Sequence, residues 1–134
     1  MHPDDLHSQR PLSLDRVVVA ARAASSKTLD ETVVLDVADL IGITDHFVIT
    51  SGRNDRQVRA VVDEVVAALK RLGVAPLRRE GGDAASWILL DYGDFVIHVL
   101  AAEAREYYGL ERLWSDAARV EWDVPAMSGG SARP

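Results

Sequence analysis

A predicted β-hairpin between Ser86 and His98 constrains the fold more than any other stretch of the chain. Ser86–Asp91 and Asp94–Val99 are apolar and β-prone, and Tyr92-Gly93 lies between them as a turn. Glycine supplies the positive φ that a two-residue hairpin loop requires. The register that follows predicts four cross-strand pairs: Leu90–Phe95, Leu89–Val96, Ile88–Ile97 and Trp87–His98.

The two faces of this hairpin differ in character, because side chains alternate along a strand. One face is wholly apolar and carries Ile88, Leu90, Phe95, Ile97 and Val99. The other is mixed and carries Trp87, Leu89, Asp91, Asp94, Val96 and His98. If helices cover only the first face, the second is an exposed amphipathic surface of the kind that marks contact sites. The alternative is that both faces are buried and Trp87 belongs to the core.

Length and composition limit the class of protein. A chain of 134 residues forms one domain, and its hydrophobic core is large enough for it to fold without disulfides or metal ions. It has no cysteine, which excludes disulfides and thiolate metal sites and fits a reducing cytosol. The N-terminus lacks a signal-peptide pattern, and no apolar run approaches the roughly 20 residues that span a bilayer. We therefore expect a soluble, cytoplasmic protein with no membrane contact.

The net charge of −6 bears on the choice of partner. Nucleic-acid binding is driven by cations that displace counterions from phosphates, and an acidic chain is poorly suited to it. Short basic clusters occur, and we interpret each as a solvated face: Arg53, Arg56 and Arg59; Lys70 and Arg71; Arg78 and Arg79. We expect little direct nucleic-acid contact and a protein surface as the main binding partner.

The remaining elements follow from periodicity and from breaker residues. We expect a loose tail over residues 1–13, one domain over 14–120 and a second loose tail over 121–134. A helix is predicted over Asp15–Ser25, because alanine favours it and Ser13 or Asp15 can cap it. Strands are predicted over Glu31–Val37, His46–Ser51 and Val74–Glu80, the last an edge strand because of Pro76.

The clearest helix begins after Asn54, which has Gln57 three residues on in a capping-box spacing. Apolar residues follow in one stripe: Val58, Val61, Val62, Val65, Val66, Leu69 and Leu72. Gly73 ends it. A short helix over Ala102–Tyr108 is interrupted by Gly109, and Leu110–Ala117 adds a turn or two with Leu110, Leu113 and Trp114 on one side.

The order of elements predicts the fold class. Consecutive strand runs exclude a simple alternating parallel sheet, so we expect an α/β fold with a mixed β-sheet of about five strands and helices mainly on one face. The opposite sheet face would then be uncovered, which favours an exposed surface around Trp87. Such a sheet resembles that of a nucleotidyltransferase, but the paired-aspartate metal motif of those enzymes does not follow Ser51-Gly52.

Candidate chemistry is sparse. The histidines lie far apart in sequence and show no metal-ligand spacing. Asp91 and Asp94 are near neighbours across the predicted turn and could form a carboxylate pair. Aspartates in turns, however, usually accept hydrogen bonds from the backbone of the turn. We therefore predict no catalytic residue, no metal and no cofactor. The alternative is a metal-dependent, nucleotidyltransferase-like enzyme that uses Asp91 and Asp94.

Five ordered motifs over residues 15–120 together resemble the ribosomal silencing factor family (RsfS, also called Iojap-like). They are Thr44-Asp-His-Phe-Val-Ile-Thr-Ser-Gly52, Arg56-Gln57, Trp87-Ile-Leu-Leu-Asp-Tyr-Gly-Asp94, Val96-Ile-His98, and Glu103-x-Arg105 through Tyr108-x-Leu110-Glu-x-Leu-Trp114-x-Asp-Ala117. Two positions depart from the pattern: His46 replaces a usual Tyr, and Asn54 stands where Ser is common.

The resemblance implies a regulator of translation rather than an enzyme. Members bind the large ribosomal subunit at its fourteenth ribosomal protein, on the intersubunit face, and block joining with the small subunit when nutrients run short. They also tend to form homodimers. Carried over by position, the expected contact residues are Trp87, Leu89, Asp91, Tyr92, Asp94, His98, Glu103, Arg105 and Tyr108. Glu103 and Arg105 could instead pair with each other, and we interpret Leu110 and Trp114 as packing residues.

Overall fold

The computed structural model describes residues 3–82 and 85–123, with side chains from residue 14 onward. Five helices lie in these ranges: α1 (Pro3–Ser25), α2 (Ala38–Ile41), α3 (Asp55–Lys70), α4 (Ala102–Tyr108) and α5 (Leu110–Leu113). The strands are β1 (Val33–Asp36), β2 (His46–Gly52), β3 (Arg78–Glu80), β4 (Trp87–Asp91), β5 (Phe95–Ala101) and β6 (Ala118–Val120).

The strands form one mixed sheet in the order β3-β4-β5-β2-β1-β6. Only β2 and β5 pair in parallel, and the other neighbours are antiparallel. The predicted mixed α/β class is confirmed, with six strands in place of about five. The predicted edge position of the strand that ends at Glu80 is also confirmed, although this strand begins only at Arg78.

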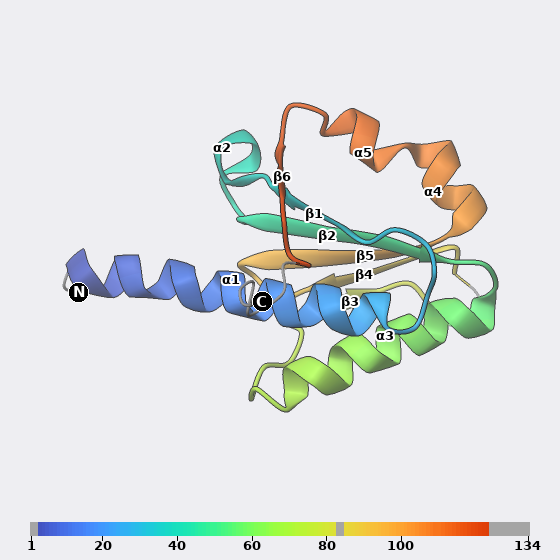
Figure 1. Ribbon diagram of the computed structural model, residues 1–134, viewed down its shortest axis with the longest axis horizontal. Helices are drawn as coiled ribbons and strands as arrows, with labels where there is room; N and C mark the ends of the chain where they lie inside the picture. The colour runs from blue at the N-terminus through green and yellow to red at the C-terminus, as the bar shows by residue number, and fades with distance from the viewer. Residues whose placement is uncertain (1–2, 83–84, 124–134) are drawn as a thin grey trace, which may run out of the picture.

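The first face of the sheet carries the main core. Figure 1 shows α1 and α3 together on this side of the sheet. Alanines of α1 allow the two helices to pack closely. The predicted stripe of α3 is buried except at Val66, which is partly buried, and at Leu72, which lies beyond the helix end and is half exposed. The strands contribute buried side chains to the same cluster: Val34, Val48, Ile88, Leu90, Phe95, Ile97 and Val99.

The second face is partly covered, which corrects the expectation that it is open throughout. Figure 1 shows α4 and α5 on this side. Leu110 of α5 and Ala104 of α4 join a second buried cluster with Leu35, Phe47 and Leu100. Gly109, at φ +59°, makes the break that lets α5 fold back over the sheet. Leu113, predicted on the packing side with Leu110, is exposed instead.

The hairpin forms, but its register differs from the prediction by two residues. Leu90 pairs with Ile97 and Trp87 pairs with Leu100. The loop is Gly93-Asp94 rather than Tyr92-Gly93, because Gly93 takes φ +87° and the Tyr92 N–H donates to the Phe95 carbonyl oxygen at 2.9 Å. A shift of two residues leaves every side chain on its predicted face, whereas a shift of one would exchange the faces.

Both predicted tails contain residues with defined structure. Helix α1 begins at Pro3, so the segment predicted as a loose tail over residues 1–13 is helical from residue 3 onward. Pro3 suits the first helical turn and two aspartates follow it, while Pro11, a helix breaker, misled the prediction. At the other end Trp122 donates from Nε1 to the Thr32 carbonyl oxygen at 2.9 Å, so the body extends past residue 120. Residues 124–134 of the second predicted tail lie outside the described residues.

Helix α3 begins with the predicted cap. The Asn54 side chain accepts a hydrogen bond from the Gln57 N–H at 2.9 Å. The Gln57 side chain reaches back to the N–H of Arg53 at 2.7 Å, one residue earlier than in a standard capping box. Asn54 therefore satisfies a helix-end donor that would otherwise be left to water.

We expect Asn54→Ala to lower the free energy of unfolding by about 1 kcal/mol, because the cap is lost while the core is untouched. Urea denaturation followed by circular dichroism measures this. Asn54→Ser is the control, since serine also caps, and equal losses in both variants would contradict the role of the cap.

Candidate functional site

The part of the second face that α4 and α5 leave open contains a groove of about 260 Å³. Strands β2, β4 and β5 supply one part of its lining, and the segment around α2 and the β3 edge supply the rest. Its lining residues are Phe47, Leu89, Val96 and His98; Ile41, Ile43 and Thr44; and Arg78, Asp91 and Gly93. Ile43 stands 85% exposed at this groove, so an apolar side chain is offered to solvent there.

Aromatic rings continue the surface from the groove toward α4. The Trp87 ring lies 5.9 Å from the His98 ring and 4.9 Å from the ring of Tyr108, centroid to centroid. Phe47 packs edge-on against His98 at 4.7 Å. Trp87 is therefore half-buried, neither sealed in the core nor free. We call the groove together with Trp87 and Tyr108 the second-face strip.

The Trp87 indole N–H donates to Nδ1 of His98 at 3.1 Å. An acceptor Nδ1 requires a neutral imidazole whose proton is on Nε2. Burial favours this neutral form, because it lowers the pKa of His98 from 6.5 to about 4. His98 thus orients the indole, and it is one of the residues that line the groove.

Five of the predicted contact residues lie on this strip: Trp87, Leu89, Asp91, His98 and Tyr108. Asp94 is exposed in the adjoining turn. Tyr92 is misplaced by the prediction, because the alternation of β4 puts it on the first face, where it is buried and stacked on Phe95 at 5.0 Å. The same burial raises the pKa of Tyr92 to about 12.

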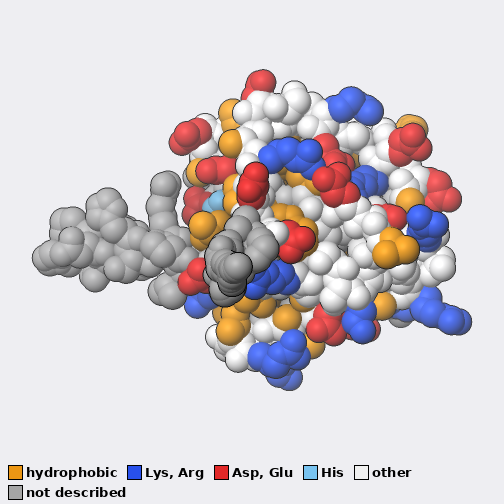
Figure 2. Space-filling view, in the orientation of Figure 1, with side chains coloured by type: hydrophobic (Ala, Val, Ile, Leu, Met, Phe, Trp, Pro, Cys, Tyr) orange, Lys and Arg blue, Asp and Glu red, His pale blue; other side chains and the backbone are white. Residues whose placement is uncertain are grey.

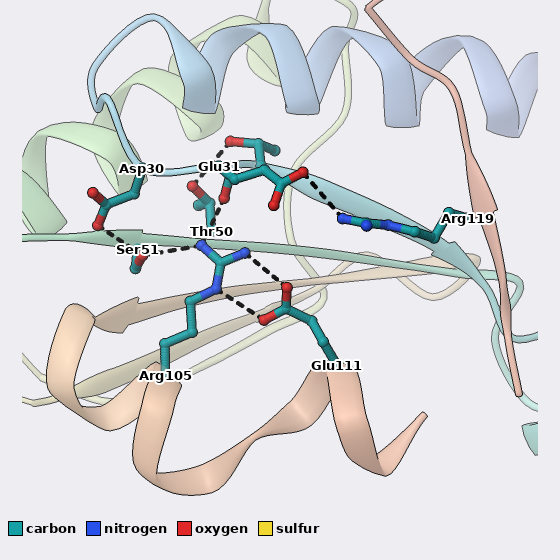
Figure 3. Close-up of polar contacts among 8 residues, drawn as sticks. Asp30, Glu31, Thr50, Ser51, Arg105, Glu111 and Arg119 are labelled. Atoms are coloured by element: carbon teal, nitrogen blue, oxygen red, sulfur yellow. Dashed lines mark hydrogen bonds and ion pairs between the residues drawn. The ribbon is translucent and has the colours of Figure 1, made fainter. Parts of the chain in front are cut away.

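Glu103 and Arg105, also predicted contacts, lie away from the groove, in the helix that follows the far end of β5. Glu103 is exposed, and Arg105 does not pair with it. Arg105 instead makes two hydrogen bonds to the carboxylate of Glu111, at 3.0 and 3.1 Å (Figure 3). The chain break at Gly109 is what turns Glu111 back toward Arg105.

Arg105 also binds two segments outside its own helices. One of its terminal nitrogens donates to the Glu31 carbonyl oxygen at 2.6 Å and to Ser51 Oγ at 3.0 Å, and Ser51 in turn donates to Asp30 at 2.8 Å (Figure 3). The side chain is only 13% exposed. Arg105 is therefore a clamp that fixes α4 and α5 on the sheet, rather than a free contact residue.

Sequence reasoning missed the wall of the groove. Ile41, Ile43 and Thr44 come from the connection after β1, and Arg78 from the edge strand. The sequence offered one indication of this wall, the apolar residues Ile41 and Ile43 on either side of Gly42. Gly42 takes φ +84° and turns the chain after α2. Nothing local to these residues indicated that they would face β4.

One carboxylate of the pair in the enzyme alternative, that of Asp91, already has partners. Asp91 accepts the Gly93 N–H at 2.8 Å and lies 3.7 Å from the Arg78 guanidinium. Across residues 3–82 and 85–123, three or more His, Asp or Glu side chains nowhere gather in a way that could hold a metal ion. In the same ranges the helices are too short or too polar to cross a membrane.

Charges of both signs are interspersed over the side of the molecule drawn in Figure 2, where Lys and Arg occur as separate groups among Asp and Glu. This side shows no continuous basic track. The net charge of the whole chain is −6.

Comparison with known proteins decides the family. The family model described as "Ribosomal silencing factor during starvation" matches residues 11–133. The chain belongs to the ribosomal silencing factor family. It is 36% identical over 105 residues to the ribosomal silencing factor RsfS of Bacillus subtilis, a match that covers 78% of this chain and 89% of that protein.

More distant members share this domain. The chain is 33% identical over 112 residues to the mouse protein named mitochondrial assembly of ribosomal large subunit protein 1, covering 81% of this chain and 48% of that protein. The crystal structure of a Chromobacterium violaceum protein superposes with a TM-score of 0.72 at 28% identity, covering 88% of this chain and 98% of that one. The six-stranded mixed fold is therefore that of a family member.

We expect Arg105→Ala to lower the free energy of unfolding by about 2 kcal/mol or more, because it leaves half-buried acceptors unpaired. Arg119→Ala is the matched control: Arg119 also binds a glutamate, Glu31, but both side chains are exposed. That change should stay within about 0.5 kcal/mol. Urea denaturation of both variants compares them, and similar losses would argue against the clamp.

The His98 pKa generates a pH prediction. Between pH 6.5 and about 4 the unfolded chain binds a proton at His98 that the folded protein does not. Stability should therefore be highest above pH 6.5 and fall as the pH is lowered toward 4, by about 1.4 kcal/mol per pH unit from this residue. The measurement is the difference between wild type and His98→Asn in urea denaturation across this range; parallel pH profiles would refute it.

Proposed function

We propose that the protein binds the large ribosomal subunit at its fourteenth ribosomal protein, on the intersubunit face, and sterically prevents the small subunit from joining. Translation is thereby repressed when nutrients are limiting. Family membership supports a ribosomal silencing role, and the mouse relative carries large-subunit assembly in its name. The finer mechanism rests on the resemblance of the five motifs and on the surface described above.

The observation that carries this proposal is the second-face strip. It combines an open groove with half-buried aromatic side chains, which is the composition of protein interfaces at their centre. Ile43 and Leu89 offer apolar area at the groove, while Arg78 and Asp91 supply polar groups beside it. Trp87 is held in place by His98 and Tyr108, so it meets a partner with little loss of side-chain freedom.

Steric exclusion follows from where the rest of the molecule lies. With the second-face strip seated on the large subunit, α1 and α3 project from the opposite side of the sheet (Figure 1). They occupy space that an approaching small subunit needs. The net charge of −6 adds repulsion toward ribosomal RNA, although salt limits its reach to about 8 Å at physiological ionic strength.

The proposal needs no catalysis, because exclusion requires only binding and bulk. In the structure the two Asp91 carboxylate oxygens already serve the turn and Arg78. Acting on ribosomes places the protein in the cytoplasm. We also propose a homodimer, for which the exposed Tyr107, Tyr108 and Leu113 of α4 and α5 offer an apolar surface.

We expect Ile43→Asp to weaken binding to purified large ribosomal subunits at least about tenfold, because a charge would be buried against apolar side chains. Co-sedimentation measures the affinity, and circular dichroism checks the fold. Leu29→Asp is the matched control: Leu29 is 92% exposed in the loop between α1 and β1, outside the groove. If both variants bind like the wild type, this face is not the docking surface.

A further inference from the structure

Two buried polar atoms of groove residues have no hydrogen-bond partner within the described residues. They are Oγ1 of Thr44 and Nε2 of His98. Thr44 is 7% exposed and His98 is 5% exposed, so both side chains are buried. Other buried threonines differ: Thr50 accepts from the Thr32 hydroxyl at 2.9 Å, and Thr28 donates to the Ser51 carbonyl oxygen at 2.8 Å.

The chemistry of these two atoms defines what the groove lacks. Nδ1 of His98 accepts the Trp87 indole N–H, so Nε2 of the neutral ring carries a hydrogen and is a donor. His98 lines the groove, whereas Trp87 does not. The Thr44 hydroxyl can donate as well as accept. A hydrogen-bond acceptor is therefore the kind of group that can pair with both atoms.

The charge and the volume of the groove further restrict the kind of ligand that can bind there. The charged residues of the groove, Arg78 and Asp91, lie 3.7 Å apart and compensate each other, so a charged ligand would meet no free counter-charge. The volume of about 260 Å³ lies below the roughly 300–1,000 Å³ of small-molecule and cofactor sites. The occupant should therefore be uncharged and small enough for this volume. A peptide segment meets both conditions, because it offers a neutral carbonyl acceptor next to an apolar side chain.

We propose that the groove recognises a neutral peptide segment of the partner protein, whose backbone carbonyl accepts hydrogen bonds from Thr44 Oγ1 and His98 Nε2 while its apolar side chain packs on Leu89 and Ile43. This rests on the proposed function and names the chemistry that the docking surface selects. Ile43 is largely exposed, so its side chain is available for this contact. Binding then satisfies two atoms that are unpaired in the free protein.

A pair of isosteric substitutions tests this. Thr44→Val removes an unpaired hydroxyl, so the melting temperature should stay the same or rise, while binding to purified large subunits weakens between about threefold and about tenfold. Thr50→Val removes a paired hydroxyl, so the melting temperature should fall and binding should not change. A purely structural role for Thr44 cannot produce this opposite pattern.

His98→Asn provides a second variant. The asparagine carbonyl can still accept from Trp87 but places no donor at the Nε2 position, so a similar loss of binding is expected. If Thr44→Val and His98→Asn bind as tightly as the wild type while Ile43→Asp does not, the hydrogen-bonding proposal is overturned and the docking surface stands. If Ile43→Asp also binds normally, the docking surface fails, and this inference with it.

Discussion

The guanidinium of Arg105 is the contact on which the rest of the surface depends. It ties α5 through Glu111, β2 through Ser51 and the segment before β1 through the Glu31 carbonyl. Three parts of the chain that are far apart in sequence thus meet at one planar group. By fixing α4 and α5 over one part of the second face, this group determines which part stays open, and the groove is what remains.

The second face therefore has two kinds of surface side by side. Where α4 and α5 cover it, Ala104 and Leu110 pack with Leu100 into an ordinary apolar core. Where it is open, His98 and Trp87 share a hydrogen bond that keeps an imidazole neutral in an apolar setting. A protein that acts by occupying another surface needs shape and hydrogen-bond complementarity there, and the engaged Asp91 fits that role better than it fits metal binding.

The faces on which side chains lie could be predicted from the sequence more accurately than the contacts between side chains. Alternation placed Leu89 and His98 together even though the loop, and with it the register, was shifted by two residues. The contact of Arg105 could not be predicted in the same way, because Glu103 is nearer in sequence and only the turn at Gly109 brings Glu111 to it. The groove wall around Ile43 was missed for a related reason, since tertiary folding alone carries that connection to β4.

The edge strand β3 bears on how copies of this chain can associate. All three of its residues, Arg78, Arg79 and Glu80, are charged and exposed. Charged side chains along an open edge discourage the pairing of one sheet with another. Self-association by a continuous intermolecular sheet is thereby disfavoured at this edge of the sheet. Strand β3 thus has two effects: it places Arg78 at the groove, and its charged residues oppose growth of the sheet into fibres.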